Sequence, residues 1–324
     1  MNQITVIGMQ TIGISVGLAL ADQKAQLART AIDRDPKRLG AAQNANAFDR
    51  YERNLSAAVN GADIVLIAAP EDELEDTFKA MASALKPGAV VIDTSPLKNA
   101  VAGWAVTHLP PANPFVSMTP ALNPDSFLET SAPRADLFHK SVMVITAAEG
   151  TSSEAFHLVS DLAELLGGHP FFADPSEADG LFAAGVWLPR LTAAALVNAT
   201  MPQAGWREGR KVAGRAYTFA TASLDEVNEE FVPGQGALEN RENVVRVLDN
   251  LIAELQTTRQ FLAENDADGL ARSLRIARQQ HSEWLQQRGS NDYATQLNKD
   301  IREVTQGSFF KRLFGLIPNP KKPS

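Results

Sequence analysis

The sequence predicts an α/β protein with an N-terminal doubly wound Rossmann domain followed by an all-helical domain. Two observations predict this architecture. Short apolar runs alternate with helical patterns through the first half of the chain, as in a parallel sheet covered by helices. From about Pro175 the strand signals stop, and long helical patterns rich in Ala, Leu, Arg and Glu follow. The predicted domains are residues 1–174, residues 175–306 and an amphipathic basic tail, residues 307–324.

The first fifty residues carry most of a dinucleotide-binding motif. An apolar run over residues 4–8 ends in Gly8, Gly13 opens an apolar helix, and a second run ends in Asp33. This spacing lets a carboxylate reach the ribose hydroxyls of an adenosine. The middle glycine of G-x-G-x-x-G is replaced by Gln10, which puts a long side chain where the phosphates approach.

The predicted cofactor is NAD or NADP. The helix N-terminus would face the pyrophosphate with its N–H groups. Asp33 favours NAD, whereas Arg34 could accept the 2′-phosphate of NADP or stack on adenine, and the balance favours NAD. The alternative is a Rossmann domain that keeps its packing glycines and has lost its ligand. The candidate cofactor-binding residues are Gly8, Gln10, Thr11, Ile12, Gly13, Asp33, Arg34, Ala69 and Pro70.

The remaining elements follow from periodicity and from helix-end signals. Further strands are predicted over residues 63–69, 89–93, 115–118 and 142–146, with helices over residues 71–85 and 151–166 between them. Gly88 and Gly167 stand where helix C-caps are expected, and Ser95-Pro96 predicts a helix start with serine as the N-cap. In the second half, helices are predicted over residues 182–199, 240–265 and 268–287.

Composition excludes several classes of function. The chain has 324 residues and a net charge of −8, which argues against a general nucleic-acid binder. It has no cysteine, so thiolate metal sites and thiol nucleophiles are excluded, and its five histidines show no paired metal-ligand spacing. No metal site is predicted.

The N-terminus lacks the pattern of a signal peptide, so a cytoplasmic location is expected. The apolar stretch over residues 181–201 is interrupted by Pro189 and Arg190, and no membrane-spanning helix is expected from it. Residues 308–317 combine apolar and basic side chains. They could contact a membrane interface, but docking on the helical domain or on a dimer partner is preferred.

In their order and spacing, several motifs resemble the prephenate/arogenate dehydrogenase family. The matching segments are residues 6–17, 31–34, 67–70, 92–98, 119–121, 188–189 and 240–243, and the resemblance extends to about Arg288. It implies an NAD(P)-dependent enzyme of tyrosine biosynthesis, with a Rossmann domain and a helical dimerisation domain. A homodimer through the helical domain and a small carboxylate substrate are therefore expected.

The family carries out an oxidative decarboxylation in which a histidine bonds the ring hydroxyl of the substrate. Here the matching residue is Thr119, whose hydroxyl can form a hydrogen bond but cannot take a proton near neutral pH. The histidine of the family's His-Leu-Pro segment is Trp187, and Ala220 stands near the position of its substrate arginine. The serine of the Gly-Ser-x-Lys segment is Pro96, although Asp93 and Lys98 match.

The resemblance and the side chains available as substitutes give the candidate site. The candidate catalytic residues are Thr119, Ser95 and Lys98, and the candidate substrate contacts are Arg190, Arg215 and Tyr217, with Lys211 and Asn123 as further possibilities. Two functions stay open. The first is an NAD(P)-dependent dehydrogenase acting on prephenate, arogenate or another small carboxylic acid through a diverged site. The second is a non-catalytic dimeric ligand sensor or interaction scaffold.

Overall fold

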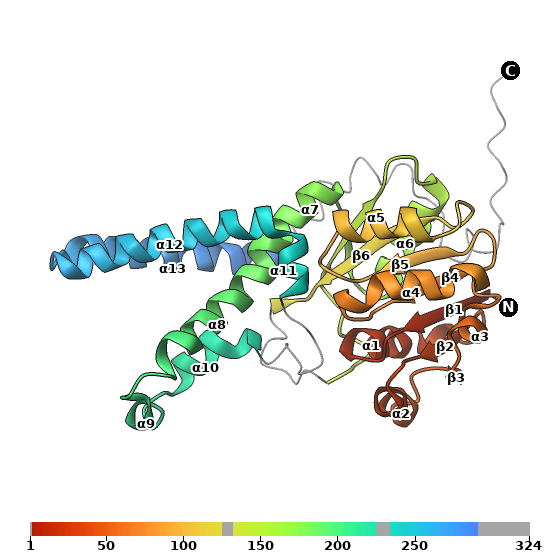
Figure 1. Cartoon of the computed structure of the whole chain (residues 1–324), viewed down its shortest axis with the longest axis horizontal. Coiled ribbons are helices and arrows are strands. Elements are labelled where there is room, and N and C mark those ends of the chain that lie inside the picture. Colours follow the sequence, from red (N-terminus) through yellow and green to blue (C-terminus); the bar gives the residue numbers. More distant parts are fainter. Residues whose placement is uncertain (1, 125–131, 225–233, 291–324) are drawn as a thin grey trace, which may run out of the picture. The chain divides into compact units, whose positions relative to one another are not determined.

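The computed structural model describes residues 2–124, 132–224 and 234–290 (Figure 1). The chain divides into two compact units. One contains Met1–Pro175 together with the chain from Ile276 onward, and the other is Ser176–Arg275. The sequence analysis instead places residues 175–306 in one helical domain. The predicted tail, residues 307–324, lies outside the described residues.

The first unit is built on an eight-stranded sheet. Its order is β3-β2-β1-β4-β5-β6-β7-β8, and every neighbouring pair is parallel except β6 and β7. The predicted α/β, doubly wound class is confirmed, and all six predicted strands are present. The strands are β1 (Asn2–Ile7), β2 (Leu27–Ile32), β3 (Arg50–Glu52), β4 (Ile64–Ile67), β5 (Val90–Asp93), β6 (Phe115–Ala121), β7 (Val142–Ala147) and β8 (His169–Phe172).

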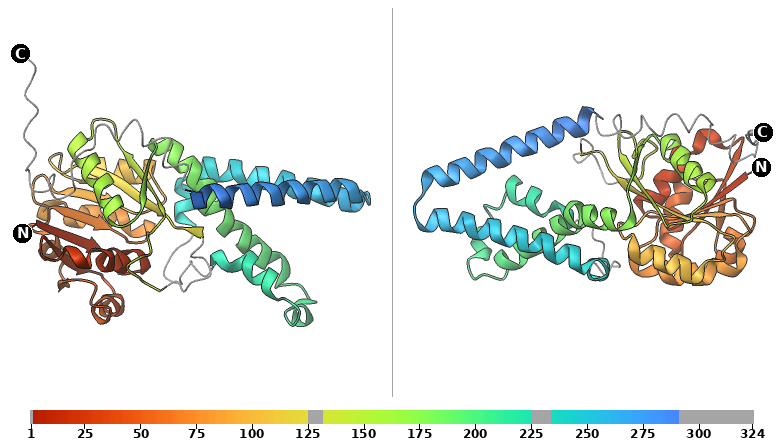
Figure 2. Two further views of the ribbon diagram at one scale, coloured as in Figure 1. Left: turned by 180° about the vertical axis from the view of Figure 1, so that it is seen from behind. Right: turned by 90° about the horizontal axis from the view of Figure 1, so that it is seen from above.

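Helices cover both faces of this sheet (Figure 2). On one face, α1 (Thr11–Ala19), α2 (Pro36–Asn44) and α6 (Ser153–Leu165) contribute Val16, Leu39 and Leu162 to the core. The other face carries α4 (Leu74–Met81) and α5 (Asn99–His108), which pack on each other. Because both faces are covered, the central strands are continuous apolar runs rather than alternating ones. The remaining short helices of this unit are α3 (Leu55–Val59), η1 (Ala21–Gln23), η2 (Glu71–Glu73) and η3 (Ala82–Ala84).

The turn between β1 and α1 depends on its two glycines. Gly8 has φ +95°, and a Cβ there would lie 2.5 Å from the Ala68 carbonyl oxygen. A Cβ on Gly13 would lie 1.8 Å from the Gly8 carbonyl oxygen. Neither position has room for a side chain, so the helix can approach the strands this closely only with glycine at both.

Two of the predicted helix-end signals differ from the structure. Ser95 does not cap a helix, because its hydroxyl donates to Asp93 Oδ2 at 2.6 Å, and α5 begins at Asn99 instead. Gly88 has φ +83° but lies in the turn before β5 rather than at a helix C-cap, with its N–H bonded to Ala112. The prediction for Gly167 is confirmed, because it follows α6 with φ +92° and its N–H bonds the Glu164 carbonyl.

The second unit consists of helices in its described part. They are α7 (Pro175–Phe182), the π-helical segment η5 (Ala183–Trp187), α8 (Leu188–Thr200), α9 (Trp206–Gly209), α10 (Arg215–Thr221), η6 (Ala222–Leu224), α11 (Gln235–Glu239) and α12 (Arg241–Ala263). The last described helix, α13 (Ala267–Ser290), begins in this unit and ends in the first. The three long helices predicted for this half are present.

The stretch Pro175–Thr200 is continuously helical, and its length and composition alone would allow it to cross a membrane. Its most apolar 18-residue window has a mean hydropathy of 1.5, and 22% of that window is buried. Pro189 and Arg190 interrupt the apolar run but not the helix, in agreement with the helix predicted over residues 182–199. Proline is accommodated because it falls in the first turn of α8, directly after the π-helical segment.

Candidate functional site

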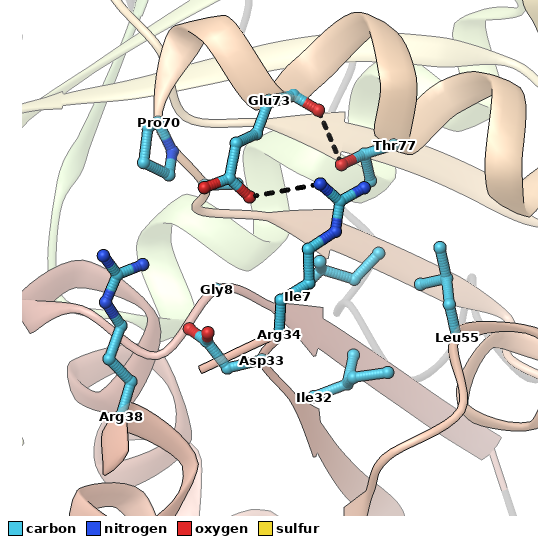
Figure 3. Close-up of a pocket in the computed structure, with 11 residues that line it drawn as sticks. Ile7, Gly8, Ile32, Asp33, Arg34, Arg38, Leu55, Pro70, Glu73 and Thr77 are labelled. Atoms are coloured by element: carbon cyan, nitrogen blue, oxygen red, sulfur yellow. Dashed lines mark hydrogen bonds and ion pairs between the residues drawn. The ribbon is translucent and has the colours of Figure 1, made fainter. Parts of the chain in front are cut away.

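A pocket opens at the carboxyl ends of β1, β2 and β4, where a doubly wound sheet binds its ligands (Figure 3). Its floor and walls combine apolar side chains with two carboxylates and two guanidinium groups. The lining residues are Ile7, Gly8, Ile32, Asp33, Arg34, Arg38, Leu55, Ala69, Pro70, Glu73 and Thr77. Five of the predicted cofactor residues, Gly8, Asp33, Arg34, Ala69 and Pro70, are therefore brought together here.

Asp33 is held in place by backbone amides. Its Oδ2 accepts from Met9 N at 2.6 Å and its Oδ1 accepts from Asp35 N at 2.7 Å. These bonds tie the end of β2 to the glycine turn after β1. Each carboxylate oxygen has two lone pairs, so Asp33 can still accept bonds from ribose hydroxyls. Its geometry fits the adenosine half of a dinucleotide.

Charges of both signs surround the outer part of this pocket. The Arg34 guanidinium, 61% exposed, lies 3.7 Å from Glu73 Oε2, as the dashed line in Figure 3 marks. Arg38 lies 3.8 Å from Asp35. Burial raises the pKa of the Glu73 carboxyl above its usual value, and the charge of Asp33 adds to this, while Arg34 opposes it. Two carboxylates and two arginines thus line the region that an adenosine 2′ substituent would occupy.

The backbone before α1 accommodates Gln10 in place of the middle glycine of the G-x-G-x-x-G motif. Gln10 is the N-cap of α1 and has an extended backbone, with φ −86° and ψ −171°, which any residue can adopt. Its side chain does not cap the amides of the first turn. Thr11 and Gly13 lie in that turn, and Ile12 packs partly against the core. Backbone conformation therefore does not require glycine at position 10.

A second polar cluster lies at the ends of β5 and β6. The Lys98 side chain is only 1% exposed, and its ammonium donates to the Ser95 carbonyl at 2.6 Å and to the hydroxyls of Ser117 and Thr119. Thr119 in turn donates to the Ser95 carbonyl at 2.5 Å. All three predicted catalytic residues, Thr119, Ser95 and Lys98, therefore belong to one hydrogen-bonded cluster.

Asp93 fixes the Ser95 side of this cluster. It is fully buried, and its Oδ2 accepts from both the amide and the hydroxyl of Ser95, at 2.9 and 2.6 Å. Its Oδ1 is buried and has no hydrogen-bond partner among the described residues. Because β5 ends at Asp93, opposite Ser117, the strand β6 continues past its neighbour, and Thr119 lies on this overhang.

The predicted substrate contacts lie in the helical unit. Arg190, on α8, lies 5.7 Å from the centre of the Trp187 ring, and Arg215, on α10, lies 4.9 Å from that of Phe219. Tyr217 shares a 2.8 Å hydrogen bond with Thr200. Tyr217 also packs its ring on Trp206 at 5.2 Å. The Tyr217–Thr200 bond joins α10 to α8, and the role of all three residues toward a substrate stays a prediction.

Trp187, expected from the resemblance to stand at a histidine position, is a core residue of the helical unit. It is 1% exposed, and a Cβ on Gly236 would lie 2.4 Å from its ring. Its indole nitrogen has no hydrogen-bond partner among the described residues. The side chain therefore packs α11 against the π-helical segment, a structural role that an imidazole would fill poorly.

Sequence reasoning missed four residues that the structure brings to these clusters: Glu73, Arg38, Ser117 and Arg288. Ser117 carried a readable signal, because it lies two positions before Thr119 and so shares its face of the strand. Glu73 and Arg38 are half-buried charges in helical segments, where the sequence pattern indicates only a solvated face, so they carried no such signal. Arg288, near the end of α13, bonds the carbonyls of Ala121 and Leu122 at 3.1 and 3.3 Å.

A scan of the described ranges finds no group of three or more His, Cys, Asp or Glu side chains that could hold a metal ion. The chemistry of the two clusters is instead that of carboxylates, hydroxyls and cations. The first cluster fits a nucleotide, and the second offers an amine and hydroxyls at the adjoining sheet edge. Both lie at the carboxyl ends of parallel strands of the same sheet.

Comparison with known protein families shows what the N-terminal domain is similar to. Residues 16–171 match the family model described as the prephenate dehydrogenase nucleotide-binding domain. This match lies within the N-terminal domain and covers just under half of the chain. The resemblance inferred from the sequence is thereby confirmed, and the pocket around Asp33 lies in a domain whose family binds nucleotides.

Relatives extend the likeness to the prephenate dehydrogenase family beyond the first domain. The chain is 26% identical to cyclohexadienyl dehydrogenase of Zymomonas mobilis over 277 residues, which cover 83% of this chain and 91% of the relative. It is 23% identical to prephenate dehydrogenase of Bacillus subtilis over 295 residues, covering 86% and 76% of the two chains. The similarity therefore spans most of both domains.

Solved structures show the same fold. Prephenate dehydrogenase from Aquifex aeolicus, in complex with hydroxyphenyl propionate and NAD+, superposes with a TM-score of 0.77 at 18% identity, covering 87% of this chain and 98% of that one. Arogenate dehydrogenase from Synechocystis superposes with a TM-score of 0.68 at 20% identity, covering 87% and 99%. The two-part architecture of the family is thus reproduced here.

Proposed function

We propose that the protein is an NAD-dependent dehydrogenase of the prephenate dehydrogenase family, acting on a small cyclohexadienyl carboxylic acid. The relatives named for prephenate, arogenate and cyclohexadienyl dehydrogenase support the reaction class. The observation that carries the proposal is the Lys98–Thr119–Ser95 cluster, at the same sheet edge as the nucleotide pocket. It supplies a hydroxyl and a buried ammonium at the position where the resemblance leads us to expect a histidine.

The dinucleotide would be held by the residues of the first cluster. Asp33 would bond the adenosine ribose, and the first turn of α1 would face the pyrophosphate with its N–H groups. The apolar side chains of Ile32 and Leu55 would flank the adenine. When bound, the nicotinamide accepts the hydride that leaves the substrate.

The phosphate preference of the cofactor follows from the charges in the pocket. Asp33 and the partly buried Glu73 both disfavour a 2′-phosphate, and Glu73 also engages Arg34, which would otherwise be available to bind it. We therefore place NAD ahead of NADP. Parallel calorimetric titrations would show tighter binding of NAD, and Glu73→Gln would narrow the difference.

Thr119 and Lys98 would act together on the substrate hydroxyl. The Thr119 oxygen accepts from Lys98 and donates to Ser95, and its second lone pair can accept a bond from a substrate hydroxyl. Threonine does not titrate near neutrality, and an ammonium donates hydrogen bonds but has no lone pair with which to take a proton. Thr119 would therefore orient the substrate hydroxyl, and the Lys98 ammonium would hold and polarise the Thr119 oxygen through its hydrogen bond.

Arg190, Arg215 and Tyr217 stay candidates for contact with the substrate acid. Their positions on α8 and α10 make them the cations and hydroxyl that the helical unit offers. If Arg190 or Arg215 binds a carboxylate, replacing it by alanine raises KM without a matching loss of NAD binding. Unchanged kinetics in both variants would remove them from the substrate site.

The helical unit supports a homodimer, and the cytoplasmic location stays a prediction from the sequence. Four large apolar side chains of α12 are exposed on one side of that helix: Val245, Ile252, Leu255 and Leu262. An apolar stripe of this kind is typical of a helix that packs against another helix. A second copy of this chain is the occupant we propose, because the resemblance implies a dimer through this domain.

Formation of NADH from NAD and prephenate or arogenate tests the proposed activity. A folded protein that binds hydroxyphenyl propionate, the ligand of the Aquifex aeolicus structure, but produces no NADH with any acid would favour a ligand sensor instead. The bonds that the Thr119 hydroxyl already makes to Lys98 and Ser95 are the observation that keeps this second candidate open.

A further inference from the structure

An arginine remote in sequence reaches the strand that carries Thr119. Arg288, near the end of α13, donates from Nη2 to the Ala121 carbonyl at 3.1 Å and to the Leu122 carbonyl at 3.3 Å. The described chain from Ile276 onward groups with the sheet domain, so this contact lies within one compact unit. A cation is thus attached two residues beyond the candidate catalytic threonine.

This contact lies on the exposed side of the second cluster. Strand β5 stops opposite Ser117, whereas β6 runs on to Ala121 without a neighbour on that side. Exposure increases along this part of β6, from Thr119 at 5% through the half-buried Ala121 to Leu122 at 38%. The half-buried Arg288 therefore lies at the more exposed end of the strand that carries Thr119.

The spacing suits an acid with a hydroxyl at its other end. Residues i and i+2 of a strand lie about 7 Å apart and point to the same face. This is roughly the distance between the two substituents at opposite ends of a six-membered ring. A ring hydroxyl bonded to Thr119 would place the opposite substituent near the guanidinium that is anchored at Ala121.

The guanidinium has the chemistry for that contact. It carries five N–H donors in a rigid fork that matches the two oxygens of a carboxylate, and the two carbonyls hold one of its nitrogens in a fixed orientation. The position near which the family places its substrate arginine is Ala220, an exposed residue of α10 that offers no charge. A substitute cation is needed if a carboxylate is bound.

We infer that Arg288 is a substrate-binding residue that receives the carboxylate at the ring end opposite the hydroxyl. This inference rests on the proposed function for the class of substrate. It concerns binding, however, and its test does not depend on turnover.

Calorimetric titration of the full-length protein in the presence of NAD provides the test. The probes are hydroxyphenyl propionate and its neutral amide, which differ only in the carboxylate. Arg288→Ala should weaken binding of the acid about tenfold to a hundredfold and leave binding of the amide unchanged. Arg288→Lys should recover part of the loss, because it restores the charge without the fork.

The matched control is Arg278→Ala, an exposed arginine of the same helix. It should bind both probes like the parent, and all variants should share its melting temperature. Equal acid binding by the parent and Arg288→Ala, or no acid binding by the parent, would overturn the inference. Arg288-dependent acid binding without NADH formation would instead uphold it and count against the proposed dehydrogenase activity.

Discussion

At position 119 a hydroxyl stands where the resemblance leads us to expect an imidazole, and two neighbouring residues bond it. Lys98, the N-cap of α5, donates to this hydroxyl, and the backbone carbonyl of Ser95 accepts from it. In the proposed site, threonine would orient the substrate hydroxyl and the ammonium would hold the threonine.

Thr119→Val keeps the shape of the side chain and removes the hydroxyl. We expect kcat to fall about 100-fold or more, with KM and NAD binding little changed, because the substrate hydroxyl loses the group that orients it for reaction. Thr119→Ser should keep most of the activity. Steady-state kinetics with calorimetry would check this, and a valine variant as active as the parent would exclude Thr119 from the chemistry.

The ion pair between Arg29 and Asp49 ties β2 to the loop before β3. Arg29 is 4% exposed and lies 2.8 Å from Asp49 Oδ1. Its hydrogen bonds hold the pKa of the Asp49 carboxyl below the usual value. Because the folded pKa is lowered, the stabilisation is present above the unfolded pKa of about 3.9 and is lost as pH falls through the folded value.

Asp49→Asn should therefore lower the free energy of unfolding by roughly 1–3 kcal/mol at pH 7, and by progressively less below about pH 4. Urea denaturation at several pH values measures this. The exposed Asp76 serves as the control, since its pair with Lys79 lies at the surface and Asp76→Asn should change little. A difference that persists undiminished at pH 2 would show that the charge of Asp49 is not its cause.

Single residues could be predicted where the local geometry admits few residue types. Gly8, Gly13 and Asp33 could be placed from spacing alone, because a tight turn and a ribose contact each admit few residue types. Arg288 could not, because its role depends on a helix that ends beside a strand 167 residues away. Glu73 gave no signal either, since an acidic residue in a helical turn is usually a solvated one.

At the scale of elements, the β1–α1 turn positions the nucleotide site. The helix packs so closely that Gly13 touches the carbonyl of Gly8, and Asp33 closes the turn from β2. Gln10 leaves this packing intact because its backbone is extended. The turn therefore keeps its shape although the motif has lost one glycine.

Gly13→Ala tests how tightly this turn is packed. Its Cβ would lie 1.8 Å from a carbonyl oxygen, so the helix must shift. We expect a loss of about 1–3 kcal/mol in the free energy of unfolding and at least tenfold weaker NAD binding. Gly40→Ala in α2 is the control, because no atom lies within 4 Å of its added Cβ, and it should stabilise slightly. Equal behaviour of the two variants would contradict the packing described here.

Elements were predictable in proportion to their apolar content. The six buried strands stood out as apolar runs, but β3, with the sequence Arg-Tyr-Glu, and β8, which contains a proline, did not. The helix start expected at Ser95 is absent because the serine hydroxyl bonds the Asp93 carboxylate instead of capping a helix. The fold, and not the sequence pattern, decides which of these two bonds the hydroxyl makes.

At the scale of the whole molecule, the helical unit leaves apolar surface exposed along α12. A charge in this stripe should prevent a second copy from packing on it. Ile252→Lys is expected to convert the dimer to a monomer in light scattering, while Glu254→Lys, on the opposite side of the helix, should leave the mass unchanged. A parent protein that is itself monomeric at micromolar concentration would refute the dimer.

If the protein oxidises a cyclohexadienyl acid with NAD, as proposed, the decisive observation is the absorbance of NADH when purified protein is mixed with NAD and either prephenate or arogenate. We expect steady NADH formation that requires both NAD and the acid and that is greatly reduced in Thr119→Val. No NADH with either acid, from a protein shown to be folded, would contradict it and leave the sensor or scaffold function in its place.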